Sequence, residues 1–255
     1  MVWDILSVCG WPVAGSRDDP PMEPPRVTLL QEQSGVDGSF LLAMLMTNHL
    51  KQSADNHVLL VAANHNAAHY TAACQKLTFN TASAIQTGQL CIVDVLAELY
   101  ASGGSLGSPE LLQLISGRIS DYDKRNTLII VDDLTFYSTM HSAGSGENAV
   151  IDFIEQLLHT TTAAHHHRMV LKVNASECYE RLCTFLIDLA DVTVSLGPLP
   201  SGSFRELDGI LTVHRKQSAY PLMSAVREQS KTLLYKVHDR MVRTYVHGEV
   251  GIKNL

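Results

Sequence analysis

TLIIVDD, residues 127–133, is an apolar run without polar alternation that ends in two aspartates. Such a run predicts a strand buried on both faces of a sheet, because a strand with one solvated face would alternate apolar and polar residues. Five similar runs lie along the chain: VTLL (27–30), HVLLVAA (57–63), QLCIVDV (89–95), RMVLKVN (168–174) and DVTVSL (191–196). Segments with helical patterns separate these runs. The sequence therefore predicts an α/β fold whose mostly parallel sheet is flanked by helices.

The connecting segments carry signals for helices. Ser108 followed by Pro109 predicts an N-cap with proline in the first helical position. A second helix is expected to begin with Asn148 as its cap, because apolar residues recur at helical spacing after it. These residues are Val150, Ile151, Phe153, Ile154, Leu157 and Leu158. Their spacing predicts a helix that packs one face on the sheet.

The pattern changes near the C-terminus. GILTVHR (209–215) and LLYKVHDRMVRTYVHG (233–248) alternate apolar and polar residues and leave no room for crossover helices. We therefore expect antiparallel strands at this end of the sheet, with residues 238–240 forming a hairpin turn.

The N-terminal residues differ in composition from the rest of the chain. PVAGSRDDPPMEPP (12–25) is too rich in proline and charge to pack in a core, so it is expected to be an extended linker. We predict a flexible segment over residues 1–25 and a single folded domain over residues 26–255. A chain of 255 residues, 45% of them hydrophobic, is long enough to bury one large core.

Composition also argues against several classes of protein. No run reaches the roughly 18 apolar residues of a membrane helix, and the first residues lack the basic start of a secretion signal, so we expect no membrane contact. Five cysteines without a CxxC pair indicate reduced thiols in the cytosol or nucleus. The histidine tract 165–167 does not have zinc-ligand spacing with Cys178 and Cys183, and no metal is expected.

The charge is unevenly distributed. A formal net charge of −7 argues against a protein that coats nucleic acid by itself, because neutralising phosphates needs a basic surface. Residues 205–253 nevertheless hold nine lysines and arginines against five aspartates and glutamates. This basic segment is either the solvated face of strands or a surface for RNA or an acidic partner, and the first interpretation needs no partner.

The loop after the first predicted strand is QSGVDGSF, residues 33–40. Aligning Gly38 with the last glycine of the phosphate-loop motif G-x-x-x-x-G-K-[ST] places Gln33 at the first glycine, Ser39 at the lysine and Phe40 at the metal-binding hydroxyl. Ser39 is too short and uncharged to replace a lysine. Phe40 has no ligand atom, and its ring is expected to lie in the core. We therefore expect no magnesium-assisted phosphoryl transfer at this loop.

Asp132 and Asp133 end the apolar run at 127–133, as the acidic residue of an NTPase does. On their own they fit equally well a helix cap or a bond to loop amides. Together with the altered loop they indicate an NTPase framework that keeps a carboxylate for structure. The degenerate nucleotide pocket predicted from the sequence comprises Gly35, Gly38, Ser39, Phe40, Asp132 and Asp133.

Four stretches resemble the Elongator complex protein 6 family, a group of RecA-like subunits. They are GVDGSFLLAMLMTNHLK (35–51), HYTAACQKLTFNTASAIQTGQLCIVDVL (69–96), TLIIVDDLTF (127–136) and LLYKVHDRMVRTYVHG (233–248). They span most of residues 26–248, whereas residues 1–25 depart from the family's usual start. The resemblance implies a RecA-like fold, related to the P-loop NTPases, without a complete phosphate loop.

The resemblance also implies a function. It points to a non-catalytic subunit of the Elongator complex that forms a heterohexameric ring with two sister RecA-like subunits, in the cytoplasm and nucleus. Such a ring binds tRNA and supports modification of the wobble uridine (U34), while the chemistry belongs to the Elongator catalytic subcomplex. Lys236, Arg240 and Arg243 in the basic segment are then the expected tRNA contacts. No cofactor is expected in this chain.

Two other functions stay open on the sequence. One is an ATP-hydrolysing RecA-like enzyme with an atypical phosphate loop, which Gln33, Ser39 and Phe40 argue against. The other is a recombinase-type DNA-binding protein, which the negative net charge argues against.

Overall fold

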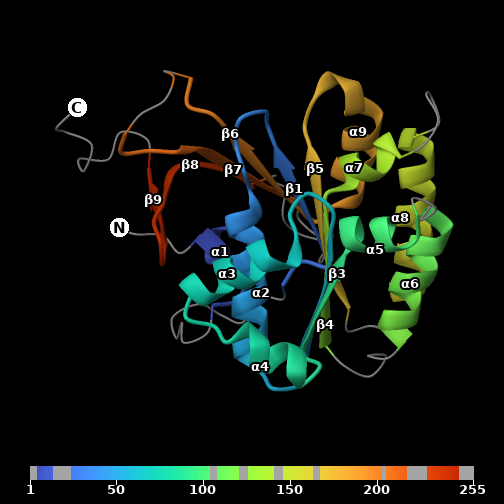
Figure 1. Cartoon of the computed structure of the whole chain (residues 1–255). Helices are drawn as coiled ribbons and strands as arrows, with labels where there is room; N and C mark the ends of the chain where they lie inside the picture. Colours follow the sequence, from blue (N-terminus) through green and yellow to red (C-terminus); the bar gives the residue numbers. More distant parts are fainter. Residues whose placement is uncertain are drawn as a thin grey trace, which may run out of the picture.

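The computed structural model describes residues 5–13, 24–103, 108–120, 126–140, 146–162, 167–200, 202, 205–216 and 229–246. The described strands form one sheet in the order β3-β2-β4-β5-β1-β6-β7-β8-β9 (Figure 1). Their bounds are β1 Val27–Glu32, β2 Asn56–Ala62, β3 Leu90–Asp94, β4 Asn126–Asp132, β5 Arg168–Asn174, β6 Val192–Gly197, β7 Gly209–Arg215, β8 Gln229–Val237 and β9 Val242–Tyr245.

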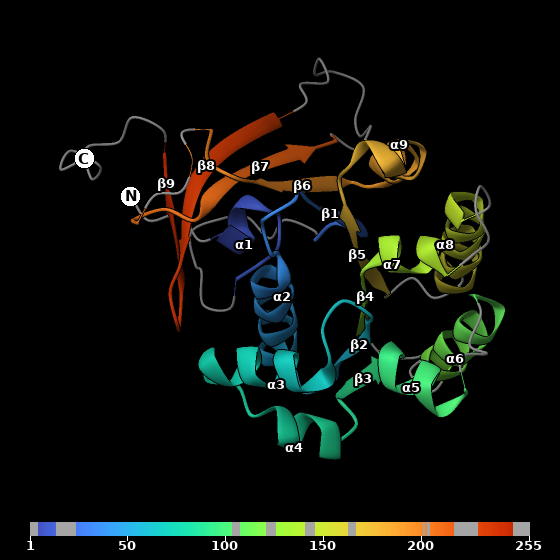
Figure 2. The same ribbon diagram turned by 45° about the horizontal axis from the view of Figure 1, so that its top comes forward.

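The strands confirm the predicted α/β architecture. From β3 to β6 all neighbours are parallel, and each of the six apolar runs provides one of these strands. The strands β7, β8 and β9 then continue the sheet in antiparallel pairs, as the alternating C-terminal pattern predicts. Figure 2 shows this antiparallel end curving over the helices of one face.

Helices cover both faces of the sheet (Figure 2). One group is α1 Ile5–Val8, α2 Ser39–Gln52, α3 Ala67–Lys76 and α4 Thr81–Gln86. The other group is α5 Val95–Ala101, α6 Ser108–Ser120, α7 Leu134–Thr139, α8 Gly146–Thr162 and α9 Glu180–Leu189, with the short 3₁₀ helix η1 Glu177–Tyr179 before α9. Among the described residues, no helix is long and apolar enough to span a membrane.

Two hydrophobic cores lie on the two faces of the sheet. Adjacent residues of one strand alternate between them: Leu30 and Leu60 belong to the core under α2, whereas Leu29 and Leu59 belong to the core under α8. This alternation is why apolar residues follow one another directly in the parallel strands. Both sets of side chains are almost completely buried.

The N-terminal segment differs from the expectation of a flexible tail over residues 1–25. Residues 5–13 fold onto the domain, where Ile5, Leu6, Cys9 and Trp11 are buried in the core on the α2 side. The guanidinium of Arg215 on β7 donates to the carbonyls of Ser7 (3.1 Å) and Val8 (3.2 Å). The boundary at residue 26 is therefore wrong, because the apolar side chains of this segment complete the core. Residues 14–23, most of the predicted linker, lie outside the described residues.

Two local predictions have different outcomes. The expected hairpin turn is confirmed, because residues 238–241 join β8 to β9 and the N–H of His238 donates to the carbonyl of Met241 at 2.8 Å. Asn148 does not cap its helix, since α8 already begins at Gly146. The carboxylate of Glu147 in that first turn accepts the N–H of Leu182 at 2.7 Å and ties α8 to α9.

Candidate functional site

The candidate site lies at the carboxyl end of β1, where ligands of open α/β sheets bind. The strand ends at Glu32, and the first loop (33–38) leads into α2 at Ser39. Gly35 adopts a φ of +86°, a left-handed conformation that glycine accepts without strain. Gly38 precedes the helix, and an added Cβ there would lie only 3.0 Å from a methyl of Leu196. Both predicted glycines therefore shape the loop.

The N–H groups that would cradle a phosphate are already used. The N–H of Gly38 donates to Glu32 Oε2 at 2.9 Å. The N–H of Ser39 donates to Asp37 Oδ1 at 2.8 Å, and the Ser39 hydroxyl donates to Asp37 Oδ2 at 2.9 Å. A helix N-terminus with free N–H groups attracts anions, and here two carboxylates of the chain itself take that place.

The centre of the site is a buried ion cluster. Lys172 on β5, the strand between β1 and β4, places its ammonium 3.1 Å from Glu32 Oε1 and 2.9 Å from Asp132 Oδ1. The side chains of Lys172 and Asp132 are fully buried. The hydroxyl of Tyr70 on α3 also donates to Asp132. The retained acid is thus held by an internal cation and a phenol.

Burial and pairing set the charges of this cluster. Burial opposes the ammonium form of Lys172, but the charges of Asp132 and Glu32 outweigh it and raise the lysine's pKa. Burial raises the pKa of Glu32, and Lys172 and the Gly38 N–H offset this only in part. Lys172 therefore stays protonated between its two carboxylates.

Asp133 has a different role from Asp132. It is the N-cap of α7, where its carboxylate accepts the N–H groups of Thr135 and Phe136, the second at 3.2 Å, and also the hydroxyl of Thr135. Burial raises the pKa of Asp133, and the Thr135 hydroxyl partly offsets this. Helix capping, which the sequence left as an alternative for this pair, accounts for Asp133.

Phe40 was expected to lie in the core, but the structure places it at the edge of the core. Its ring is half-buried and packs on the ring of Tyr235 from β8, with centroids 5.4 Å apart. The ring also lines a cavity of about 320 Å³ between α2, α3 and the β8–β9 hairpin. The following residues Leu41, Leu42 and Leu45 are buried, as predicted. Phe40 differs because it lies on the side of α2 that faces the curved antiparallel strands.

Two histidines that the sequence did not indicate stand beside the first loop. His65 follows β2, and His69 lies in the first turn of α3. Their rings stack with centroids 4.0 Å apart. His69 Nε2 is 3.0 Å from Ser39 Oγ, and His65 Nε2 is 3.4 Å from Asp37 Oδ1. The sequence places these two histidines four residues apart. This spacing could indicate a site only if the loop after β1 were already known to lie beside them.

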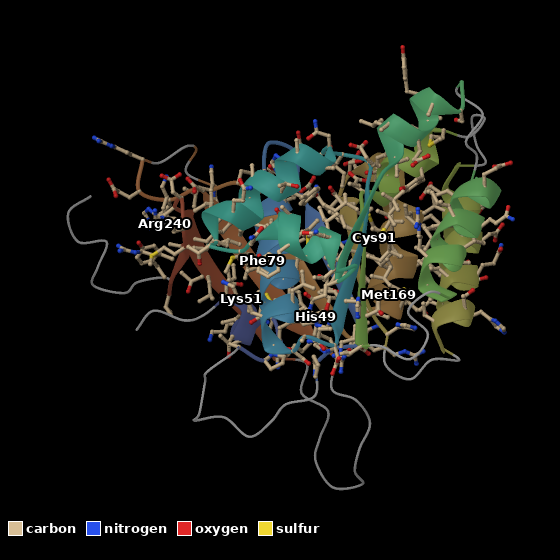
Figure 3. The ribbon with its side chains drawn as sticks, turned by 60° about the horizontal axis from the view of Figure 1, so that its bottom comes forward. His49, Lys51, Phe79, Cys91, Met169 and Arg240 are labelled. Atoms are coloured by element: carbon tan, nitrogen blue, oxygen red, sulfur yellow. The ribbon has the colours of Figure 1, made fainter. Side chains whose placement is uncertain are left out.

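The three predicted tRNA contacts share the β8–β9 hairpin. Lys236 and Arg243 lie opposite each other in the antiparallel register, and Arg240 is exposed in the turn (Figure 3). Lys236 is neutralised by Asp208, with 2.6 Å between its ammonium and Oδ1. Arg243 is exposed. The hairpin is therefore less basic than its sequence suggests.

The fold and the site together define a class of protein. A parallel sheet in which β5 separates β1 from the acid-bearing β4, followed by antiparallel strands, is a RecA-like domain. A KaiC-like protein of Pyrococcus horikoshii has a similar structure, with a TM-score of 0.62 and 11% sequence identity over 87% of this chain and 90% of that chain. In the present chain, the carboxylates of Glu32 and Asp37 accept N–H groups of the loop that corresponds to the phosphate loop.

Comparison with curated proteins gives a more specific similarity than the fold does. The chain is 29% identical over 238 residues to Elongator complex protein 6 of Drosophila melanogaster and 27% identical over 251 residues to that of Homo sapiens. Each match covers 88% of this chain and 91% of the relative. No family model matches the chain. The chain is therefore similar to the Elongator complex protein 6 proteins over most of its length, in agreement with the resemblance seen in the sequence.

Proposed function

We propose that the chain is a non-catalytic RecA-like subunit of the Elongator complex. The observation that carries this proposal is the use of the loop N–H groups by Glu32 and Asp37. An ATP phosphate would find these donors taken and would meet two negative charges. At a separation of 4 Å, two like charges repel by about 4 kcal/mol at an effective dielectric constant of 20.

The alternative of an ATP-hydrolysing enzyme requires an available acid and a hydroxyl for Mg²⁺. Asp132 instead faces the ammonium of Lys172 and the hydroxyl of Tyr70. Phe40 stands where the hydroxyl is needed, and it offers no oxygen. These contacts favour a structural use of the retained acid.

Within the same proposal, the chain forms a heterohexameric ring with two sister RecA-like subunits, and the ring associates with the Elongator catalytic subcomplex. The sheet offers places for neighbours, because its outermost described strands β3 and β9 each have one unpaired edge. On α5, beside β3, Tyr100 is 91% exposed and Leu96 is 42% exposed. Exposed apolar side chains of this kind are typical of interaction surfaces when they gather in a patch.

The assembled ring is proposed to bind tRNA and to support wobble-uridine modification in the cytoplasm and nucleus. The chain's overall charge of −7 disfavours tRNA binding by this subunit alone, so affinity would come from phosphate contacts pooled over several subunits. Arg240 and Arg243 are the exposed cations that this chain contributes from the hairpin. Lys236 contributes less, because Asp208 already neutralises it.

Co-expression with the two sister subunits tests the assembly. We expect the chain to elute with both partners in one complex on size-exclusion chromatography. A stable, monodisperse monomer that ignores both sisters would contradict the subunit proposal.

A gel-shift titration of the assembled complex tests the tRNA surface. The double variant Arg240→Glu/Arg243→Glu should weaken tRNA binding by about tenfold and reduce the salt dependence, since two phosphate contacts are lost. Arg118→Glu, an exposed arginine of α6 in the other helix group, serves as the matched control. Equal affinity of the double variant and the control would remove these arginines from the tRNA surface.

A further inference from the structure

A cluster of metal-ligand side chains lies over the altered phosphate loop. Asp37 comes from the first loop, His65 from the end of β2 and His69 from the first turn of α3. One ligand atom of each residue lies within 4.8 Å of the corresponding atoms of the other two. His65 Nε2 already lies 3.4 Å from Asp37 Oδ1, and the two imidazole rings are stacked with centroids 4.0 Å apart, so the rings have to rotate before a nitrogen of each can face one ion.

The donor set suits a transition-metal ion. Two imidazole nitrogens and one carboxylate oxygen are ligands that Zn²⁺ accepts in tetrahedral sites, with a fourth position left for water. Zinc ligands lie about 2.0 to 2.2 Å from the ion, so the three donors must move closer together by side-chain rotation. The site is open to solvent, because the side chains of His65 and Asp37 are 28% and 53% exposed.

The surroundings hold the carboxylate in place. Asp37 accepts the N–H and the hydroxyl of Ser39, one on each oxygen, and each oxygen keeps capacity for a further bond. Hydrogen bonds of this kind fix the orientation of a carboxylate that binds a metal ion.

The electrostatics of this end of the sheet favour a cation. Four carboxylates, those of Glu32, Asp37, Asp132 and Asp133, gather near the ammonium of Lys172. A phosphate loop is built to attract an anion, whereas this loop carries its own negative charge. A divalent cation would balance the negative charge of these carboxylates that Lys172 does not neutralise.

We propose that Asp37, His65 and His69 bind one divalent transition-metal ion, Zn²⁺ in preference to Mg²⁺, at the mouth of the altered phosphate loop. The preference follows from the two imidazoles, since Mg²⁺ selects oxygen ligands. In these contacts each Nε2 carries the ring proton. On binding, that proton passes through solvent to Nδ1 of the same neutral ring, and the Nε2 lone pair binds the ion in place of the contact with Asp37 for His65 and with Ser39 for His69. The Ser39 hydroxyl keeps its bond to Asp37.

The test uses the full chain, treated with chelator and then titrated with Zn²⁺ and, for its absorption spectrum, with Co²⁺. His165 and His166 are first replaced by glutamine, so that the histidine tract does not bind the added metal. In this background we expect one Zn²⁺ per chain and a Co²⁺ spectrum of a four- or five-coordinate site. A tenfold excess of Mg²⁺ should not displace the Zn²⁺.

Single variants identify the ligands. His65→Ala and His69→Ala should each weaken Zn²⁺ binding by about tenfold or more, whereas His214→Ala, an exposed histidine of β7, should leave it unchanged. Circular dichroism checks that each variant is folded, and His69→Gln replaces His69→Ala if the alanine variant unfolds. Absence of stoichiometric Zn²⁺ binding, or equal affinity in the ligand variants and in His214→Ala, would overturn the proposal.

Discussion

The ammonium of Lys172 lies 2.9 Å from Asp132 Oδ1, and both side chains are fully buried. Lys172 belongs to β5, which lies between β4, the strand that ends in Asp132, and β1, the strand before the first loop. Its second partner is Glu32 at the end of β1, whose Oε1 is 3.1 Å from the ammonium. The ends of β1 and β4 are therefore joined by an internal cation on β5.

Removing this cation should destabilise the fold strongly. Lys172→Met keeps the length of the side chain but leaves Glu32 and Asp132 buried without compensation, which typically costs about 3 to 5 kcal/mol. Urea unfolding measures the loss. Lys76→Met, an exposed lysine of α3, should change the free energy of unfolding by less than about 0.5 kcal/mol. Similar midpoints for the two variants would show that the cluster does not support the fold.

Truncating Phe40 should cost less than truncating a core side chain. Its ring is half-buried against Tyr235, so Phe40→Ala is expected to lose about 1 to 2 kcal/mol, below the 3 to 5 kcal/mol typical of a fully buried phenylalanine. Leu42→Ala, two residues on and fully buried, should lose about 2 to 5 kcal/mol. Thermal and urea unfolding of both variants give the comparison. A larger loss for Phe40→Ala than for Leu42→Ala would place the ring in the core after all.

The stability should fall in mild acid because of His49. This side chain is buried at the end of α2 near the first residue of β4, and its Nε2–H donates to the carbonyl of Asn126 at 3.1 Å (Figure 3). Burial lowers the pKa of His49 to about 4, and nearby Arg168 adds to the effect. The unfolded chain binds this proton below about pH 6.5, whereas the folded chain does not until about pH 4.

The free energy of unfolding should therefore decrease by roughly 3 kcal/mol from this residue as the pH falls from 6.5 to 4. His49→Gln keeps a donor for Asn126 but has no proton to bind. Urea unfolding at several pH values should show that the variant loses less stability than the unmodified chain over this range. Parallel pH profiles for the two proteins would contradict the assignment.

The strands were predictable because burial on both faces leaves apolar residues at every position, as in 127–133. Lys172 is a charged residue in one of these strands, and a lysine in such a run is itself a signal of a buried partner. Its partners could not be named from the sequence, because Glu32, Asp132 and Lys172 come from three separate strands. The loop was recognised as altered from Ser39 and Phe40. The hydrogen bonds of Glu32 and Asp37 to the loop N–H groups could not be predicted, because they depend on the conformation of the loop and not on the spacing of residues in the sequence.

The N-terminal segment shows a different limit. A short helix over Ile5–Val8 has too few turns for its periodicity to be recognised. Cys9 and Trp11 are core residues because distant side chains hold the segment on the domain: Arg215 of β7 donates to the carbonyl of Ser7, and Asn48 and Gln52 of α2 donate to that of Pro12. The contact between Arg215 and Ser7 joins residues that are 208 positions apart, so it cannot be predicted from local sequence patterns.

Isothermal titration of the purified chain with ATP and Mg²⁺ tests the central claim most directly. Because Glu32 and Asp37 occupy the loop N–H groups and Lys172 engages Asp132, the account predicts no binding at micromolar concentrations and no ATP turnover. Micromolar, magnesium-dependent ATP binding that is lost in Asp132→Ala would contradict it.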